Sequence, residues 1–323
     1  MTKAILLVGG YGTRLRPLTE DLPKPMLPIA GLPVTEHQLM MAKKAGITDI
    51  VLATSYLSEV FLPYFGDGSA FGMSITYATE KSPLGTGGAI RNAALELGEE
   101  YLASDEPLVI FNGDIISHHH IDCQISFHLE HSADVTLHLT RVEDARAFGC
   151  VPTDDQGRVT AFFEKMENPV TNAINAGCYV FHPSVIGKIA ADAVVSVERE
   201  VFPELVAGGG RVFGYEEQAY WLDIGTPAAL LKGSRDLVGK DFIALDHSQI
   251  DPSATLTGGS AIGRHCIVEG DVTIAGSIIS DGSIIGRGSV LENCFVARGT
   301  QVPAGTSCEN TYISSEKMAP LTL

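Results

Sequence analysis

The chain has 323 residues, long enough for one large or two medium domains with a sizeable buried core. Its 39 acidic and 22 basic residues give a formal net charge of −17, which argues against nucleic acid or an anionic membrane surface as a partner. Any phosphate-bearing ligand must therefore be attracted by a local positive site, against the average field of the molecule.

The remaining bulk features predict a cytoplasmic protein without a membrane partner. No apolar run reaches the roughly 18 to 20 residues of a membrane span, and the first residues lack a signal-peptide pattern. The 6 cysteines are widely spaced and form no Cys-x-x-Cys pair, which favours reduced thiols over disulfides or zinc ligands.

The first stretch with chemical character follows an apolar run at residues 4–8, which predicts a buried parallel strand. The glycines at positions 9, 10 and 12 come next, and backbone N–H groups of such a loop can turn toward one point and bind a polyphosphate. Arg14, Arg16 and Lys24 add full positive charge. An ordinary tight turn is the alternative, but it leaves these cations unexplained.

This loop differs from two familiar phosphate-binding motifs. It lacks the Gly-Lys-Ser/Thr of a P-loop. Leu15 stands where the third glycine of a dinucleotide fingerprint belongs, which counts against a dehydrogenase.

Strands and helices are predicted to alternate through the first part of the chain. Apolar runs at 49–53, 74–78 and 108–111 read as strands, and helical spacing at 34–45, 58–65 and 87–97 separates them. This alternation predicts an α/β fold with a mostly parallel sheet, whose ligands bind beyond the carboxyl ends of the strands. Further strands are expected at 135–139, 159–163 and 176–181.

Two aspartates follow apolar strands directly. Asp114 ends Phe111-Asn112-Gly113-Asp114, and Asp223 precedes Ile224-Gly225-Thr226-Pro227 at an expected helix start. A carboxylate beside a glycine that lets phosphate approach suits Mg²⁺, which takes few protein oxygens and completes its shell with water and phosphate. The alternative is an aspartate that only caps the following turn.

The stretch Gly9-Gly10-Tyr11-Gly12-Thr13-Arg14-Leu15 with Pro23-Lys24-Pro25 resembles the signature of the sugar nucleotidyltransferases, or NDP-sugar pyrophosphorylases. Within that family it looks most like the bacterial mannose-1-phosphate guanylyltransferases. The resemblance implies a Rossmann-like nucleotidyltransferase domain at 1–240, a cytoplasmic enzyme, and the transfer of a nucleotidyl group from GTP to a sugar 1-phosphate with release of pyrophosphate.

The resemblance also implies roles for individual residues. Arg14, Lys24 and Lys165 would be catalytic, together with Asp114 and Asp223, which would hold Mg²⁺. The nucleotide would be bound by Leu7, Gly9, Gly10, Gly12, Thr13, Arg14, Lys24, Glu80, Gly85, Thr86 and Gly113. The sugar phosphate would be bound by Gly149, Glu164, Lys165, Asn175 and Gly177.

The base and the sugar are less constrained. Pro83-Leu84-Gly85-Thr86-Gly87-Gly88 resembles the family's base-contacting loop, and Glu80 stands where uridylyl and thymidylyl members tend to have Gln. A carboxylate accepts both donors on one edge of guanine, which favours GTP. A solvated loop glutamate is the alternative. Another hexose or a cyclitol 1-phosphate of the valienol type, another NTP, or a regulatory homologue without activity remain open.

The middle of the chain supplies the expected sugar-phosphate contacts. Glu164-Lys165 resembles the family's Glu-Lys-Pro, with Met166 in place of proline, although such a pair is also common at surfaces. The stretch 196–203 matches the family and is interpreted as helix and packing. The histidines at 118–120 are expected in a polar turn, and those at 128 and 131 on a helix, without a metal role.

From residue 250 onward, apolar residues recur every six positions, which predicts a parallel β-helix at 241–323. The resemblance implies that it is left-handed. The expected inward residues are Ile250, Leu256, Ile262, Val268 and Ile274, and after a slip in the period Ile278, Ile284, Val290, Val296, Val302 and Cys308, with Cys266 and Cys294 at corners. A role in forming a homo-oligomer or in regulation is favoured over acyl transfer, since solenoid sides and ends pair readily.

Overall fold

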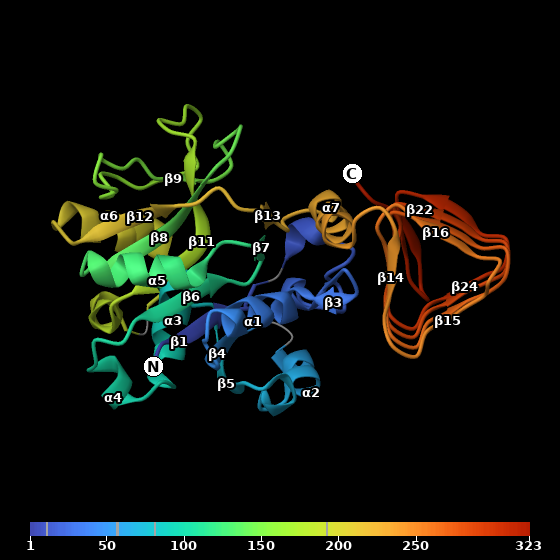
Figure 1. The fold of residues 1–323 in the computed structure, drawn as a ribbon, viewed down its shortest axis with the longest axis horizontal. Coiled ribbons are helices and arrows are strands. Elements are labelled where there is room, and N and C mark those ends of the chain that lie inside the picture. Colours follow the sequence, from blue (N-terminus) through green and yellow to red (C-terminus); the bar gives the residue numbers. More distant parts are fainter. Residues whose placement is uncertain (11, 56–57, 81, 192) are drawn as a thin grey trace. The chain divides into compact units, whose positions relative to one another are not determined.

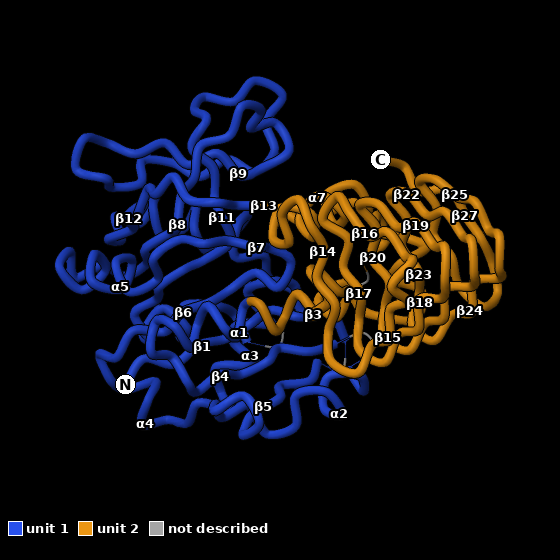
Figure 2. The backbone as a smooth tube through the Cα atoms, turned by 45° about the vertical axis from the view of Figure 1, so that its right-hand side comes forward, with its two compact units in different colours: residues 1–10, 38–221 blue, residues 11–37, 222–323 orange. Residues whose placement is uncertain are grey.

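The computed structural model describes residues 1–10, 12–55, 58–80, 82–191 and 193–323. Its contacts divide the chain into two compact units, coloured separately in Figure 2. Unit 1 consists of Met1–Gly10 and Gln38–Trp221, and unit 2 of Tyr11–His37 and Leu222–Leu323. The chain thus leaves unit 1 after its first strand and returns to it at Gln38. A domain boundary at residue 240 stays a prediction.

Unit 1 is built on a nine-stranded sheet whose main strands follow the order β5-β4-β1-β6-β11-β8-β12. The first four are parallel, as the alternation of strands and helices predicts, whereas β11 runs antiparallel to both of its neighbours. The predicted Rossmann-like fold is confirmed. The strands are β1 (Lys3–Leu7), β4 (Asp49–Thr54), β5 (Ser74–Thr79), β6 (Leu108–Asn112), β8 (Val135–Arg141), β9 (Gly149–Cys150), β10 (Phe163–Glu164), β11 (Ala173–Phe181) and β12 (Val212–Glu216).

Helices pack along this sheet (Figure 1) and bury one continuous apolar core with it. Among the described residues, no helix is both long and apolar enough to cross a membrane. The helices are α1 (Val34–Lys44), α2 (Phe61–Phe65), α3 (Gly85–Leu95), α4 (Glu99–Leu102), α5 (Ile121–Glu130) and α6 (Phe202–Ala207), with a π-helix at Val197–Val201. Short strands lie at β2 (Pro28–Ile29), β3 (Leu32–Pro33), β7 (Ile115–Ser117) and β13 (Trp221–Asp223).

The strand expected at 159–163 is wrong over most of its length. Only Phe163 begins a strand, while Val159 forms a single bridge with Thr153. Phe162 is buried and its ring lies 5.4 Å from that of Phe202. The apolar run therefore reflects packing of an irregular segment against the core.

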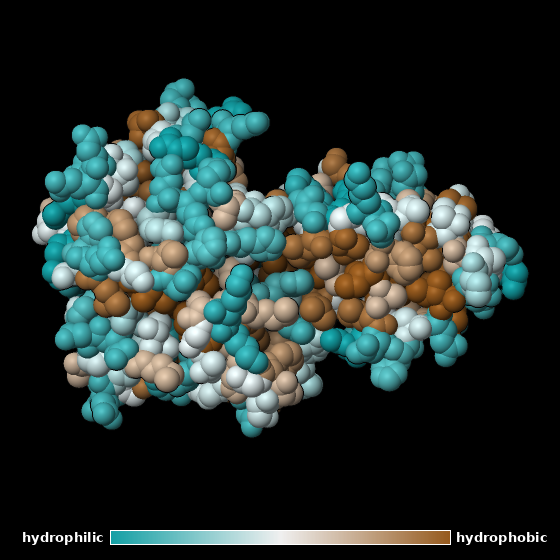
Figure 3. Space-filling model, in the orientation of Figure 1, coloured by the Kyte–Doolittle hydropathy of each residue, from teal (hydrophilic) through white to brown (hydrophobic). Residues whose placement is uncertain are grey.

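Unit 2 carries α7 (Pro227–Val238) and a parallel β-helix, whose triangular section is visible in Figure 1. Each strand from β14 to β23 pairs in parallel with the strand one coil later, β27 closes the last sheet antiparallel to β26, and the predicted β-helix is confirmed. Figure 3 looks onto one end of the β-helix and shows apolar residues in the middle of that end. The strands are β14 (Phe242–Ala244), β15 (Gln249–Ile250), β16 (Thr255–Thr257), β17 (Ser260–Ile262), β18 (Ile267–Val268), β19 (Thr273–Ala275), β20 (Ile278–Ile279), β21 (Ile284–Ile285), β22 (Val290–Glu292), β23 (Phe295–Val296), β24 (Gln301–Val302), β25 (Ser307–Glu309), β26 (Thr311–Ile313) and β27 (Met318–Pro320).

The predicted phase of the repeat is wrong between residues 278 and 290. Ile279, Ile285 and Leu291 belong to the core of the β-helix, whereas Val290 is 44% exposed. The cause is the step at one corner: the next inward residue is Ile279, five residues after Ile274, whereas the predicted phase resumes at Ile278, one position early. Cys266 and Cys294 are buried as expected of corner residues, and Cys308 pairs with inward-facing Leu291.

Three histidines are buried in unit 1, and one of them, His119, comes from the expected polar turn. His119 stacks on His138 with ring centroids 3.8 Å apart and lies within hydrogen-bond distance of Ser117 and Gln124. His128 lies 2.9 Å from the hydroxyl of Thr136. Burial lowers the pKa of His119 and His128 to about 4 and that of His138 to about 2. Among the described residues, no three or more His, Cys, Asp or Glu side chains gather into a group that could hold a metal ion, and these rings are neutral parts of the core.

The corrected phase of the repeat predicts opposite outcomes for two adjacent residues. Leu291→Ala removes a fully buried side chain and should cost about 2–5 kcal/mol of unfolding free energy. Val290→Ala, its matched control on the exposed face, should stay within about 0.5 kcal/mol of the parent. Urea unfolding followed by circular dichroism measures both; a larger loss in the Val290 variant would restore the phase predicted from the sequence.

The buried histidines predict a loss of stability in mild acid. Below pH 6.5 the unfolded chain takes up protons that the neutral folded rings refuse, so the unfolding free energy falls as pH falls. His138→Leu should remove about 2 kcal/mol of the loss between pH 7 and pH 5. Exposed His118→Gln is the control. The measurement is the urea midpoint of unfolding at both pH values. If the His138 variant lost as much stability in acid as the parent protein, the prediction would be contradicted.

Candidate functional site

The loop after β1 begins in unit 1, where close backbone approach leaves no room for side chains. The Gly10 amide donates to the Ser55 hydroxyl at 3.2 Å, and a Cβ on Gly9 would lie 2.7 Å from that same oxygen. A Cβ on Gly113 would fall 2.1 Å from the Leu7 carbonyl oxygen. Leu7 and the loops after β1 and β6 thus meet at one edge of the sheet, as the sequence predicts. Tyr11 lies outside the described residues.

The loop continues in unit 2, where its cations meet a carboxylate. Lys24 is largely buried, and its Nζ lies 3.5 Å from Oδ1 of Asp223. The Arg14 guanidinium packs against Gly225, where an added Cβ would lie 3.2 Å from its nitrogens. Gly12 has φ 56° and its carbonyl accepts from Thr19. Thr13 begins the short 3-10 helix that places Arg14. Two predicted cations and one predicted metal ligand therefore share unit 2.

The predicted base-contacting loop is held by hydrogen bonds within unit 1. Gly85 has φ 72°, and a Cβ there would lie 2.5 Å from the Val195 carbonyl oxygen. The Thr86 hydroxyl donates to Glu198 at 2.7 Å and accepts from the Val197 amide at 2.9 Å. Its side chain is thus committed inside the protein.

Glu80 closes the other end of this loop. Its Oε2 accepts from the Leu84 amide at 3.3 Å, and burial raises the pKa of its carboxyl group. The residue is half-buried, in contrast to the solvated loop glutamate considered as the alternative. Lys81, within the same loop, lies outside the described residues.

A polar cluster gathers around a bulge in β11. The strand register shifts between Asn175 and Tyr179, at Gly177 with φ 79°. The Asn175 amide donates to the Tyr179 hydroxyl at 2.9 Å, and Asn112 donates to the same oxygen at 3.2 Å. A Cβ on Gly177 would lie 3.1 Å from Asn112 Nδ2. Burial raises the pKa of Tyr179 well above its usual value, so its hydroxyl stays neutral.

Glu198 is a polar residue that sequence reasoning missed. Its segment was interpreted as packing, but the π-helix at Val197–Val201 turns this carboxylate inward. Glu198 accepts from Thr86, from Ser196 at 2.9 Å and from the Tyr179 hydroxyl at 3.5 Å. It thereby links the predicted base loop to the predicted sugar-binding strand. The family match of the segment was the available signal; the π-helix has no simple sequence signature, and such bulges are frequent at functional sites.

Gln38 was also missed. It is buried on α1 and donates to the carbonyls of Asn112 at 2.7 Å and Ile115 at 2.9 Å. These two bonds bracket Gly113 and Asp114. The side chain of Gln38 therefore holds the loop that carries Asp114, although Gln38 belongs to no recognisable sequence motif.

The remaining residues predicted to bind the sugar phosphate lie on or next to the short antiparallel pair of strands β9 and β10. Gly149 pairs directly with Glu164 between β9 and β10, and a Cβ on Gly149 would lie 2.9 Å from the Phe162 ring. Lys165 has φ 55° and its side chain is 60% exposed, with Nζ 3.7 Å from Glu164. Lys165 is thus available to a ligand rather than buried in an ion pair.

Members of the nucleotidyl transferase family generally use a divalent metal. The predicted ligands fit a hard cation in their chemistry, because Asp114 and Asp223 both offer carboxylate oxygens. Asp114 belongs to unit 1 and Asp223 to unit 2, so their sharing of one ion stays a prediction.

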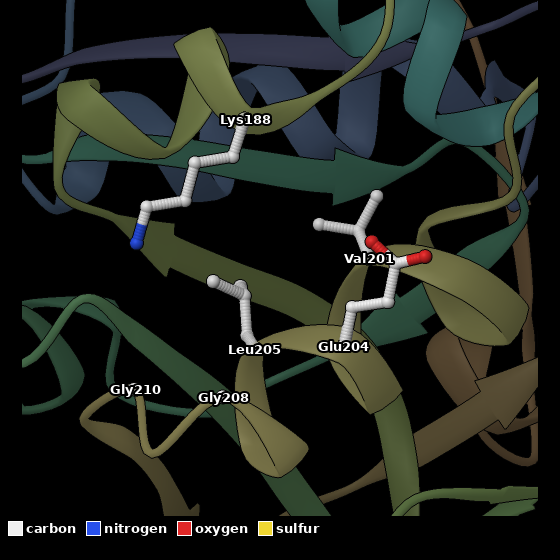
Figure 4. Close-up of a pocket in the computed structure, with 6 residues that line it drawn as sticks. All are labelled: Lys188, Val201, Glu204, Leu205, Gly208 and Gly210. Carbon is white, nitrogen blue, oxygen red and sulfur yellow. The ribbon is translucent and has the colours of Figure 1, made fainter.

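A cavity of about 280 Å³ lies elsewhere in unit 1 (Figure 4). Lys188 extends over it from one side and α6 borders the other, with Glu204 and Leu205. No residue predicted to bind a substrate lines it.

Comparison with known proteins gives a consistent result. The model of the Nucleotidyl transferase family matches residues 3–239. A mannose-1-phosphate guanylyltransferase of Mycobacterium tuberculosis is 47% identical over 290 residues, which cover 85% of this chain and 79% of the relative. Mannose-1-phosphate guanylyltransferase 1 of Arabidopsis thaliana is 35% identical and is covered to 82% of its length, with 93% of this chain.

The fold has matches among solved structures as well. The crystal structure of HddC from Yersinia pseudotuberculosis superposes with a TM-score of 0.61 at 27% identity, covering 73% of this chain and 100% of that one. Sequence and structure agree with the expectation drawn from the glycine loop, Lys24 and the hexapeptide repeat. The chain belongs to the nucleotidyl transferase family.

Proposed function

We propose that the protein joins GTP and mannose 1-phosphate to give GDP-mannose and pyrophosphate. The observation that carries this proposal is the 47% identity to a mannose-1-phosphate guanylyltransferase over most of both chains. The charged side chains expected for that reaction are present and are held by the contacts described above. A regulatory homologue without activity is disfavoured for the same reason.

The triphosphate would be bound by the cationic loop, which we define as residues 12–37. Arg14 and Lys24 supply positive charge in a chain whose net charge is −17, and the amides after β1 add donors. Because the attacking and leaving groups are both anionic, positioning and charge neutralisation account for most of the catalysis. Lys24 would stabilise the leaving pyrophosphate in place of its present partner Asp223.

Asp114 and Asp223 would hold the divalent cation, which we propose to be Mg²⁺. When bound, this ion neutralises phosphate charge and orients the α-phosphate for in-line attack. Gln38 contributes indirectly, since its two bonds fix the backbone on either side of Asp114.

The sugar 1-phosphate would lie against β10 and β11. Lys165, with an exposed ammonium, would hold the attacking phosphate. Glu164 and Asn175 would bind hydroxyls of the sugar. Another hexose or a cyclitol 1-phosphate fits the same donor and acceptor set, so substrate choice is tested directly below.

The reaction and its substrates can be tested in a single assay. Pyrophosphate release should be fastest with GTP and mannose 1-phosphate among a panel of NTPs and sugar or cyclitol 1-phosphates, and should require Mg²⁺. A faster pair elsewhere in the panel would reassign the substrates. No release with any pair would remove the enzymatic proposal for this chain.

Lys24→Ala should lower kcat/KM by about 100-fold or more, because it removes a charge that acts on the phosphates during transfer. Exposed Lys240→Ala is the matched control and should leave turnover unchanged. Circular dichroism checks that both variants fold. Turnover of the Lys24 variant near the parent level would exclude this residue from the mechanism.

Glu80→Gln should reduce the preference for GTP over UTP by about 10-fold or more, because a neutral amide no longer selects two donors on guanine. The amide oxygen still accepts from the Leu84 amide, so the loop should keep its shape. The ratio of kcat/KM values for the two nucleotides is the measurement. An unchanged ratio would restrict Glu80 to holding the loop.

A further inference from the structure

One sheet of the β-helix is covered on its outer face. Side chains alternate between the core and the outside along each strand, and the outward residues of β17 to β26 in this sheet are all nearly inaccessible. These residues are Ala261, Ile278, Phe295 and Tyr312, with exposures between 0% and 3%. Outward Ile267 and Val290 on the two other sheets are 38% and 44% exposed. The outer face of this sheet is therefore covered by other residues of the protein.

Helix α7 is the first part of that cover. It packs against β17 of the β-helix and against β2 of the cationic loop. A Cβ on Gly259, next to β17, would lie 2.8 Å from the Cα of Arg235, so the helix backbone approaches the coil closely. The Arg235 guanidinium donates to the Asn293 side-chain oxygen at 2.7 Å. Asn293 has φ 50° at a corner of the coil.

The same helix holds the cationic loop from its other side. The buried Ser234 hydroxyl accepts from the Ala30 amide at 3.0 Å. Ala30 and Gly31, both with positive φ, form the turn between β2 and β3. A Cβ on Gly31 would lie 2.9 Å from the Leu245 side chain, which follows β14 of the β-helix. The turn is thus fixed between α7 and the first coil.

A third contact lies near the end of the chain. Lys317, between β26 and β27, forms an ion pair with Glu20 of the cationic loop. The Tyr312 hydroxyl has its pKa raised by burial and also by the neighbouring charge of Asp21. The cationic loop therefore rests on the β-helix at several points along its length.

We propose that the β-helix positions the cationic loop for catalysis, through α7, with Ser234, Arg235 and Asn293 as positioning residues. The proposal deepens the function proposed above and rests on it for its kinetic consequence. The contacts fix the segment that carries Arg14 and Lys24, and Asp223 lies just before the first turn of α7. Loosening the contact at Asn293 should let Lys24 leave its position without changing any residue that touches substrate.

Asn293→Gly removes the acceptor of Arg235 and keeps a residue that tolerates φ 50°. Asn310→Gly is the matched control: it stands one coil later, also has φ 50°, and its side chain donates to its neighbour Glu309. Hydrogen exchange of amides in the cationic loop should be about 3- to 10-fold faster in the Asn293 variant than in the control, as expected for one lost hydrogen bond of ordinary net strength.

Steady-state kinetics supply the second readout. The KM for GTP should rise by about 3- to 10-fold in Asn293→Gly, while the KM for mannose 1-phosphate and the melting temperature should match those of Asn310→Gly. Ser234→Ala should act in the same direction, because it leaves the Ala30 amide without its acceptor.

The two readouts separate failure of this proposal from failure of the proposed function. Loop exchange equal in the two Asn variants would overturn the anchoring, whatever the kinetics show. Faster exchange with an unchanged KM for GTP would overturn the catalytic role of the anchoring. If the parent protein released no pyrophosphate with any substrate pair, the enzymatic function would fall, and the exchange comparison would still decide whether the β-helix holds the loop.

Discussion

The ion pair between Lys24 and Asp223 is the interaction on which the predicted nucleotide site depends. It joins the cationic loop to the residues that lead into α7, with side chains 11% and 24% exposed. At this depth each charge has lost much of its water, so removing either partner would leave the other poorly compensated. A polyphosphate can replace the carboxylate as the partner of Lys24, provided that a cation takes up the charge of Asp223. In the proposed function, the pair would therefore couple nucleotide binding to metal binding.

Much of the fold follows from local patterns. The glycines after β1 predict close backbone approach, and Gly113 lies so near Leu7 that no other residue fits. The alternation of apolar strands with helical spacing is enough to predict the parallel half of the sheet. The six-residue period predicts a β-helix because one inward residue per side of a triangular coil is a geometric requirement.

The errors and omissions arise where tertiary structure decides. A five-residue step at one corner displaces the inward position from Ile278 to Ile279, and both are apolar, so composition cannot separate them. His119 reads as polar, yet it is buried because Ser117 and Gln124 satisfy its ring nitrogens. Glu198 faces inward only because a π-helix adds a residue to the turn. Each of these features depends on partners that are far away in the sequence, or on a backbone geometry that no sequence motif predicts.

The internal hydrogen bonds also limit what the predicted ligand residues can do. The Thr86 hydroxyl donates to Glu198 and accepts from Val197, so its contribution to a nucleotide would come from its backbone. Asn175 likewise uses its amide on Tyr179 and its oxygen on the Gly177 amide. These bonds exist before any ligand binds. The loops are therefore already ordered, and ordering them does not reduce the free energy of binding. The mixed sheet thus presents backbone groups in fixed positions, and in the proposed function the charged side chains of the cationic loop would supply the affinity for phosphate.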